Sequence, residues 1–159
     1  MHLVKCDYTH WDFVKFLRSH PDVQSGFIDY VTDISKIQQT QYMSKNWEYF
    51  WVLCDKDYIQ YGYIGLINND KDEITYCIDP KYQGLGYGKL IVEKLISKNS
   101  NKNIWAKVKK NNIPSCKVFE KLDYFKYNYE YIKNSEIFKI YSSINLTDEQ
   151  IKLRCIHEA

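Results

Sequence analysis

A glycine-rich turn in the middle of the chain constrains its fold more than any other feature. The stretch 79–91 reads Asp-Pro-Lys-Tyr-Gln-Gly-Leu-Gly-Tyr-Gly-Lys-Leu-Ile, so a strand ends, glycines turn the backbone, and a helix begins at once. Gly84, Gly86 and Gly88 remove side chains that would keep a ligand away from the backbone. The free amides of the first helical turn and the helix dipole then face an anion. The sequence therefore predicts a binding site for a pyrophosphate.

The length and composition indicate one globular domain. The chain has 159 residues, of which 45% are hydrophobic and 26% charged, enough for a proper core. Its formal net charge of +2 lacks the broad basic field of nucleic-acid binders, so we expect no nucleic-acid partner. No apolar run approaches the roughly 20 residues that span a bilayer, and no N-terminal stretch resembles a signal peptide. We therefore expect no membrane partner and a cytoplasmic location.

The cysteines indicate neither a metal site nor a disulfide framework. There are five of them, an odd number, and they are widely separated, with no CxxC pair or Cys/His cluster. We expect reduced cysteines in the core and no bound metal.

The pattern of apolar residues predicts an α/β (α+β) domain with a mixed, twisted central sheet. Three strands joined by polar turns precede the glycine turn, and a strand–helix–strand unit contains it. Thr147, with Gln150 at the capping-box spacing, predicts a short helix outside the core or a linker. We expect one domain over 1–145 and an extension over 146–159. The expected strands are 1–7, 49–54, 58–67, 73–78, 104–108, 124–132 and 136–144, and the expected helices are about 9–20, 34–45, 86–98 and 115–122.

Other phosphate-binding loops fit the glycine turn poorly. A Walker loop fails at Gln83 and Leu90, and a dinucleotide fingerprint fails at Lys89 and would lie in the first strand–helix unit. The pattern that fits is QxxGxG over 83–88, after a strand that ends in Ile-Asp-Pro at 78–80. This pattern resembles the GNAT superfamily of acetyl-coenzyme A dependent N-acetyltransferases.

The resemblance covers nearly the whole chain, because the order of elements from residue 1 to about 144 agrees with the GNAT fold. It implies acetyl-coenzyme A as the co-substrate, with its pyrophosphate on the loop amides and its pantetheine arm along the strand 73–78. The residues that it assigns to coenzyme binding in this region are Cys77, Ile78, Gln83, Gly84, Leu85, Gly86, Tyr87, Gly88 and Lys89.

A second motif follows at 112–124, where Asn-Ile-Pro-Ser-Cys-Lys-Val-Phe-Glu-Lys-Leu-Asp-Tyr resembles the family's NxxSxxxYEKxGF. By this resemblance Asn112 and Ser115 would hydrogen-bond the pantetheine and phosphate region. Position 119 would carry the tyrosine that protonates the leaving thiolate in many members. Here it is Phe119, which would still contact the coenzyme but has no proton to give. We expect Tyr124 or Tyr76 to act as the acid instead, or the thiolate to leave without one.

Acetyl transfer to an amine needs a neutral nitrogen, so a base must remove a proton from the ammonium. Glu73 opens the strand that would carry the pantetheine, where several family members place a catalytic glutamate, and it is the candidate base. The alternative is a solvated carboxylate at a strand start beside Asp70 and Asp72. The backbone N–H of Cys77 or Ile78 would bind the oxyanion if this strand bulges as in relatives.

The acceptor half, residues 8–67, is where GNAT proteins differ. Arg18, His20, Phe27 and Trp47 resemble a pattern shared by members that acetylate nucleotide-linked amino sugars and members that acetylate ribosomal-protein N-termini, so we expect them to contact the acceptor. The 15 tyrosines and 4 tryptophans supply flat faces for a sugar or uracil ring. This favours a nucleotide-linked amino sugar, with a protein or peptide N-terminal amine as the alternative.

Two further interpretations follow from the same residues. Phe119 also suits a non-catalytic domain that binds coenzyme A as a sensor or assembly partner. The aromatic strands near the C-terminus leave a sheet edge that could pair with a second copy in a homodimer.

Overall fold

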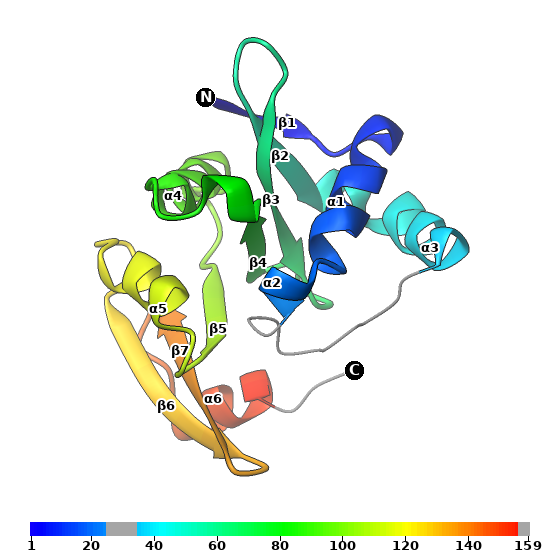
Figure 1. The fold of residues 1–159 in the computed structure, drawn as a ribbon. Helices are drawn as coiled ribbons and strands as arrows, with labels where there is room; N and C mark the ends of the chain where they lie inside the picture. Colours follow the sequence, from blue (N-terminus) through cyan, green and yellow to red (C-terminus); the bar gives the residue numbers. More distant parts are fainter. Residues whose placement is uncertain (25–34, 156–159) are drawn as a thin grey trace.

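The computed structural model describes residues 1–24 and 35–155, which contain seven strands and six α-helices (Figure 1). The strands are β1 His2–Lys5, β2 Phe50–Cys54, β3 Gln60–Ile67, β4 Glu73–Ile78, β5 Trp105–Lys109, β6 Tyr127–Lys133 and β7 Glu136–Ser142. The α-helices are α1 Trp11–Arg18, α2 Pro21–Gln24, α3 Lys36–Asn46, α4 Tyr87–Lys98, α5 Ile113–Glu120 and α6 Asp148–Cys155. Short 3-10 helices lie at Tyr8–His10, Trp47–Tyr49 and Pro80–Tyr82.

All seven strands join one sheet in the order β1-β2-β3-β4-β5-β7-β6. Neighbouring strands are antiparallel except β4 and β5, which are parallel and connected through α4. The predicted mixed sheet of seven strands is therefore confirmed. The four expected flanking helices are α1, α3, α4 and α5, α6 follows Thr147 where a short helix was one expectation, and α2 is additional.

Helices cover both faces of the sheet. On one face, α4 and α5 bury Ile91 and Phe119 together with Ile74 of β4. On the other face, α1 and α3 bury Leu17 and Met43 together with Cys77 of the same strand. Because successive residues of a strand point to opposite faces, Ile74 and Cys77 mark the two sides of β4.

The C-terminal helix α6 packs on the sheet and contributes to the core. Leu146 and Cys155 are buried in a cluster with Trp105 of β5. The predicted capping box forms, because the Thr147 N–H donates to Gln150 Oε1 at 2.8 Å and the Gln150 N–H donates to Thr147 Oγ1 at 3.2 Å. The expectation of a helix outside the core is wrong, since this segment covers apolar side chains of the sheet.

Candidate functional site

A cavity of about 1520 Å³ opens where β4 and β5 separate. In the described chain these parallel strands share one Cα register pair, Glu73 with Trp105, and form no further pair along their length. Side chains 74–78 of β4 and 106–108 of β5 line the cavity, with α4 and α5 on one side and α1, α2 and α6 on the other. Ligand pockets usually measure roughly 300–1,000 Å³. The cavity therefore has room for a large ligand and a second reactant.

The turn between β4 and α4 leaves its backbone open toward this cavity. Gly84 and Gly86 have φ angles of +78° and +89°, left-handed values that favour glycine. A Cβ on either residue would meet no protein atom within 4 Å. The hydrogen-bond ladder of the helix begins where the Leu90 N–H donates to the Gly86 carbonyl at 3.2 Å, so the amides before Leu90 lie outside the ladder. Open space, free amides and the helix dipole together fit a phosphate group.

Two residues of the loop have positions that differ from those of the glycines. The Gln83 Nε2 group donates to the Ile78 carbonyl at 3.1 Å, which ties the turn to the end of β4. The Leu85 side chain is exposed and is not among the residues that line the cavity, whereas Tyr87 and Lys89 line it. A contact from Leu85 to a ligand would therefore come from its backbone.

Gly88 also has a packing role. A Cβ at this position would lie 3.2 Å from Val118 Cγ2 of α5 and 3.6 Å from the Tyr76 ring. The absence of a side chain thus lets α4 and α5 approach closely. The sequence predicted that Gly88 clears space for a ligand, but it did not indicate that Gly88 lies against α5.

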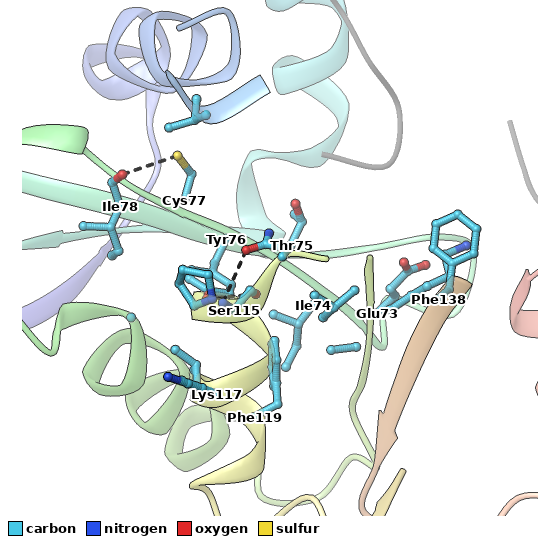
Figure 2. A pocket seen from close by; sticks show the side chains of 18 of the residues that line it. Glu73, Ile74, Thr75, Tyr76, Cys77, Ile78, Ser115, Lys117, Phe119 and Phe138 are labelled. Atoms are coloured by element: carbon cyan, nitrogen blue, oxygen red, sulfur yellow. Dashed lines mark hydrogen bonds between the residues drawn. The ribbon is translucent and has the colours of Figure 1, made fainter. Parts of the chain in front are cut away.

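Tyr76 of β4 and Ser115 of α5 meet inside the cavity, with their hydroxyl oxygens 3.0 Å apart (Figure 2). Asn112 caps α5, because its Oδ1 accepts from the Ser115 N–H at 3.4 Å, and this holds Ser115 in the first helical turn. Phe119 lies one turn later, and its buried ring is 6.0 Å from the Tyr76 ring between centroids. The second sequence motif and β4 therefore line the same cavity.

The protonation of Tyr76 suits a proton donor. Burial raises the pKa of the phenol to about 12, against a smaller lowering by the hydrogen bond with Ser115. The phenol keeps its proton at neutral pH. Tyr76 therefore supplies a protonated hydroxyl on the side of the cavity that α5 lines. Phe119, on the same side, has no hydroxyl.

Tyr124, the other candidate acid, has a structural position. Its hydroxyl donates to the Lys102 carbonyl at 3.0 Å and accepts from the Ile104 N–H at 3.1 Å. These bonds anchor the loop before β5, and Tyr124 is not among the described residues that line the cavity. Of the two candidate acids, the structure brings Tyr76 to the cavity.

Glu73, Thr75 and Cys77 project from the side of β4 opposite to Tyr76, and Figure 2 shows Cys77 and Thr75 on one side of the strand and Ile74 on the other. Burial, followed by the charge of Asp79, raises the pKa of the Cys77 thiol to about 12. This thiol stays protonated and is a poor nucleophile. All five cysteines are buried and free, as the sequence predicted.

The bulge in β4 on which the oxyanion role of Cys77 or Ile78 was made conditional does not appear in the pairing of β4 with β3. The register of β4 with β3 runs without a shift from Ile78 opposite Gly62 to Glu73 opposite Ile67. Any N–H group that Cys77 or Ile78 offers to an oxyanion therefore comes from a regularly paired strand.

The four residues expected to contact the acceptor are dispersed. Arg18 lines the cavity. His20 does not, because its Nδ1 accepts from the Asp22 N–H at 3.1 Å and its ring packs against a neighbour on α1. Trp47 packs against the core beneath α1 and α3, also away from the cavity. Phe27 lies outside the described residues.

The sequence did not indicate that α6 reaches the cavity, where Leu153, Arg154 and Cys155 form part of the lining. The Lys107 ammonium donates to the Arg154 carbonyl at 3.1 Å, and the Lys133 ammonium donates to the Cys155 carbonyl at 3.0 Å. These bonds fix the last turn of α6 against β5 and β6. The capping-box spacing signalled a helix, but no local pattern showed where the helix would pack.

The sequence of the chain matches the model of the acetyltransferase (GNAT) domain over residues 2–124. This match covers more than half of the chain, which therefore belongs to the GNAT acetyltransferase family. The protein is an acyltransferase that uses acetyl-coenzyme A. No curated protein matches the sequence.

Solved structures share the fold at low sequence identity. A domain from Methanocaldococcus jannaschii superposes with a TM-score of 0.73 at 17% identity, covering 88% of this chain and 96% of that one. Spermidine N-acetyltransferase from Vibrio cholerae, solved with coenzyme A and spermine, gives 0.68 at 16% identity over 87% and 92%. Ribosomal L7/L12 alpha-N-protein acetyltransferase gives 0.66 at 16% identity over 90% and 89%. At these identities the likeness concerns the fold.

None of the helices in residues 1–24 and 35–155 combines the length and the apolar character needed to cross a membrane. The His, Cys, Asp and Glu side chains of the same residues form no group of three or more that could hold a metal ion.

Proposed function

We propose that the protein transfers the acetyl group of acetyl-coenzyme A directly to the primary amine of a small-molecule acceptor. The observation that supports this most is one cavity that reaches both sides of the sheet at the β4–β5 separation. Tyr76 lines it on one side of β4, and Glu73 lines it on the other. Direct transfer needs an acid at the departing sulfur and a base at the attacking nitrogen, held on opposite sides of the thioester.

In this proposal the backbone around residues 84–89 binds the pyrophosphate, and the space between β4 and β5 takes the pantetheine arm. Lys89 and Lys117 line the cavity and carry charges that suit the phosphates. Asn112 and Ser115 lie at the α5 side of the same space, where their polar groups can meet the coenzyme. The observed opening at Gly84 and Gly86 supports this arrangement.

Glu73 takes a proton from the ammonium of the acceptor, and Tyr76 gives a proton to the sulfur as the C–N bond forms and the C–S bond breaks. The ammonium loses two protons in total, of which one ends on the thiol and one is released to water. Tyr76 regains its proton before the next cycle because its pKa is about 12. The base and the acid thus act on different sides of β4 and do not neutralise each other.

The acceptor within this function is an amino group of a nucleotide-linked amino sugar. Arg18, Lys107 and Arg154 line the acceptor side of the cavity and suit a diphosphate. A protein or peptide N-terminal amine is the alternative, and it is the type of substrate named for the ribosomal L7/L12 alpha-N-protein acetyltransferase.

A thiol-release assay tests the proposal. Purified protein, acetyl-coenzyme A and a panel of nucleotide-linked amino sugars, peptides and polyamines are combined, and free thiol is followed with a dye reagent. Release stimulated by an amine, with one acetyl group gained by that amine in mass spectrometry, is the expected result. Tight binding of acetyl-coenzyme A without stimulation by any amine would instead favour the non-catalytic sensor.

A further inference from the structure

We propose that α6 forms one wall of the acceptor site and that the Arg154 guanidinium binds an anionic group, a carboxylate or a phosphate, carried by the amine substrate. This inference rests on the proposed function and specifies the class of acceptor.

The last turn of α6 lies near Glu73 through Trp105. Glu73 and Trp105 are Cα partners in the parallel pair β4–β5, so their side chains leave the sheet on the same face. The Arg154 guanidinium lies over the Trp105 ring, 5.1 Å from its centroid. Trp105 therefore connects the proposed base to the last turn of α6.

Electrostatics at Cys155 agree with this proximity. Burial raises the pKa of the Cys155 thiol, the Lys107 and Lys133 ammonium groups lower it, and the Glu73 carboxylate raises it. Charged side chains of β4, β5 and β6 therefore all lie close enough to the end of α6 to influence the Cys155 thiol. The acceptor amine at Glu73 would lie next to this helix.

The Arg154 side chain is held in place and still has a donor without an acceptor. Its Nη1 group donates to the Gln150 carbonyl at 3.2 Å, and its plane packs over Trp105, so the side chain is held in place. Its Nε group is buried and has no hydrogen-bond partner in the described protein. A buried donor without an acceptor is costly, and the edge formed by Nε and Nη2 matches the two oxygens of a carboxylate or phosphate. An anionic group beside Trp105 would satisfy this edge.

Cationic side chains outnumber carboxylates among the described residues on the acceptor side of the cavity. The described cationic side chains lining it are Arg18, Lys107, Lys133 and Arg154, and the described carboxylates are Asp22 and Glu73. Since Glu73 is assigned to the amine, the remaining balance is positive. A substrate with a negative group fits this field, whereas a polyamine would meet repulsion.

The end of α6 is also rigidly placed, as a recognition element requires. Lys107 and Lys133 donate to the carbonyls of Arg154 and Cys155 from two different strands, and the Cys155 side chain is buried. A side chain on such a support loses little freedom when it binds a ligand. Arg154 is therefore a specificity residue that touches the substrate away from the reacting atoms.

Three amino sugars with matched scaffolds test the proposal: glucosamine, glucosamine 6-phosphate and muramic acid, with spermidine as a cationic comparison. The phosphate and carboxylate compounds distinguish the two sources of negative charge. We expect kcat/KM to be about tenfold or more higher for at least one anionic sugar than for glucosamine, and lowest for spermidine.

Arg154→Gln should raise KM for the anionic sugar about tenfold or more while leaving kcat and the acetyl-coenzyme A Kd little changed. Arg154→Lys should recover part of the loss, because it keeps the charge without the planar fork. Lys152→Gln is the matched control, since it removes one positive charge from an exposed position of the same helix that does not line the cavity. Its kinetics should equal those of the unchanged protein.

Equal effects of Arg154→Gln on glucosamine and on the anionic sugars would overturn the proposal, as would equal effects of Arg154→Gln and Lys152→Gln. These outcomes leave the acetyltransferase function intact. If no amine is acetylated, the anionic sugars are titrated into the coenzyme A complex and their binding is measured by calorimetry. Binding that is weakened by Arg154→Gln supports the inference, and the absence of such binding contradicts it. The melting temperature of each variant shows whether the fold is retained.

Discussion

The Tyr76 hydroxyl lies 3.0 Å from the Ser115 hydroxyl, which places a phenol from a strand beside the helix that carries Phe119 one turn later. In the family pattern the phenol comes from that helix, at the position of Phe119. Here a strand residue supplies a hydroxyl to the same space, and burial keeps it protonated. The cavity therefore holds a protonated phenol although position 119 is a phenylalanine.

Tyr76→Phe should lower kcat about 100-fold or more, because it removes the proton donor to the sulfur while keeping the ring. The Kd of acetyl-coenzyme A, measured by titration calorimetry, should change little. The double variant Tyr76→Phe with Phe119→Tyr should regain part of the activity by returning a phenol to the helix. Unchanged kcat in Tyr76→Phe would mean that the thiolate leaves without a side-chain acid.

Glu73→Gln should lower kcat about 100-fold or more at pH 7, because the ammonium then lacks a base. Activity of the variant should rise with pH, since the free amine becomes more abundant, and the coenzyme affinity should stay the same. Asp70→Asn is the control, as it removes a carboxylate from the exposed turn before β4 that does not line the cavity. Glu73 has no part in the chemistry if both variants retain full turnover.

The glycine turn between β4 and α4 could be predicted from sequence because its cause is local. A φ angle of +78° or +89° favours glycine over other residues, so the presence of glycine at 84 and 86 predicts a left-handed backbone there. The seven strands followed from runs of apolar and aromatic residues in the same way. Residue types alone do not show which strands separate, so the sequence did not indicate the cavity between β4 and β5; the family resemblance placed the pantetheine arm only along the strand 73–78.

The roles of Tyr124 and α6 could not be predicted, because both depend on contacts between distant parts of the chain. Tyr124 has the right chemistry for an acid, but its bonds to Lys102 and Ile104 place it in a loop support. The sequence of α6 is mostly polar, and its place is fixed by lysines on β5 and β6 and by the burial of Cys155. Such long-range bonds leave no periodic signal in a single segment.

The variants Gly86→Asn and Gly86→Asp distinguish the effect of side-chain size from the effect of negative charge at the glycine turn between β4 and α4. Both side chains enter the same open space, and Asn tolerates the left-handed φ of +89°. The Asn variant should bind acetyl-coenzyme A more weakly, and the Asp variant should bind about tenfold or more weakly again, because its carboxylate faces the phosphates. If calorimetry at low salt gave the two variants equal affinities for acetyl-coenzyme A, the proposal that this turn binds the phosphates would be contradicted.

The alkaline limit of stability should depend on Cys6, which is fully buried beneath the helices of the second face. Burial, followed by the charge of Asp7, raises the pKa of its thiol from 9.0 to about 12. The native state then keeps a proton that the unfolded chain loses above pH 9. The stabilisation is complete below pH 9 and falls by about 1.4 kcal/mol per pH unit as the pH rises toward 12.

Cys6→Ala should lower the free energy of unfolding at pH 7 by about 1 kcal/mol through lost packing, yet reduce its decline between pH 9 and 10.5 in urea titrations. A decline as steep as in the unchanged protein would show that other buried thiols and phenols control the alkaline limit.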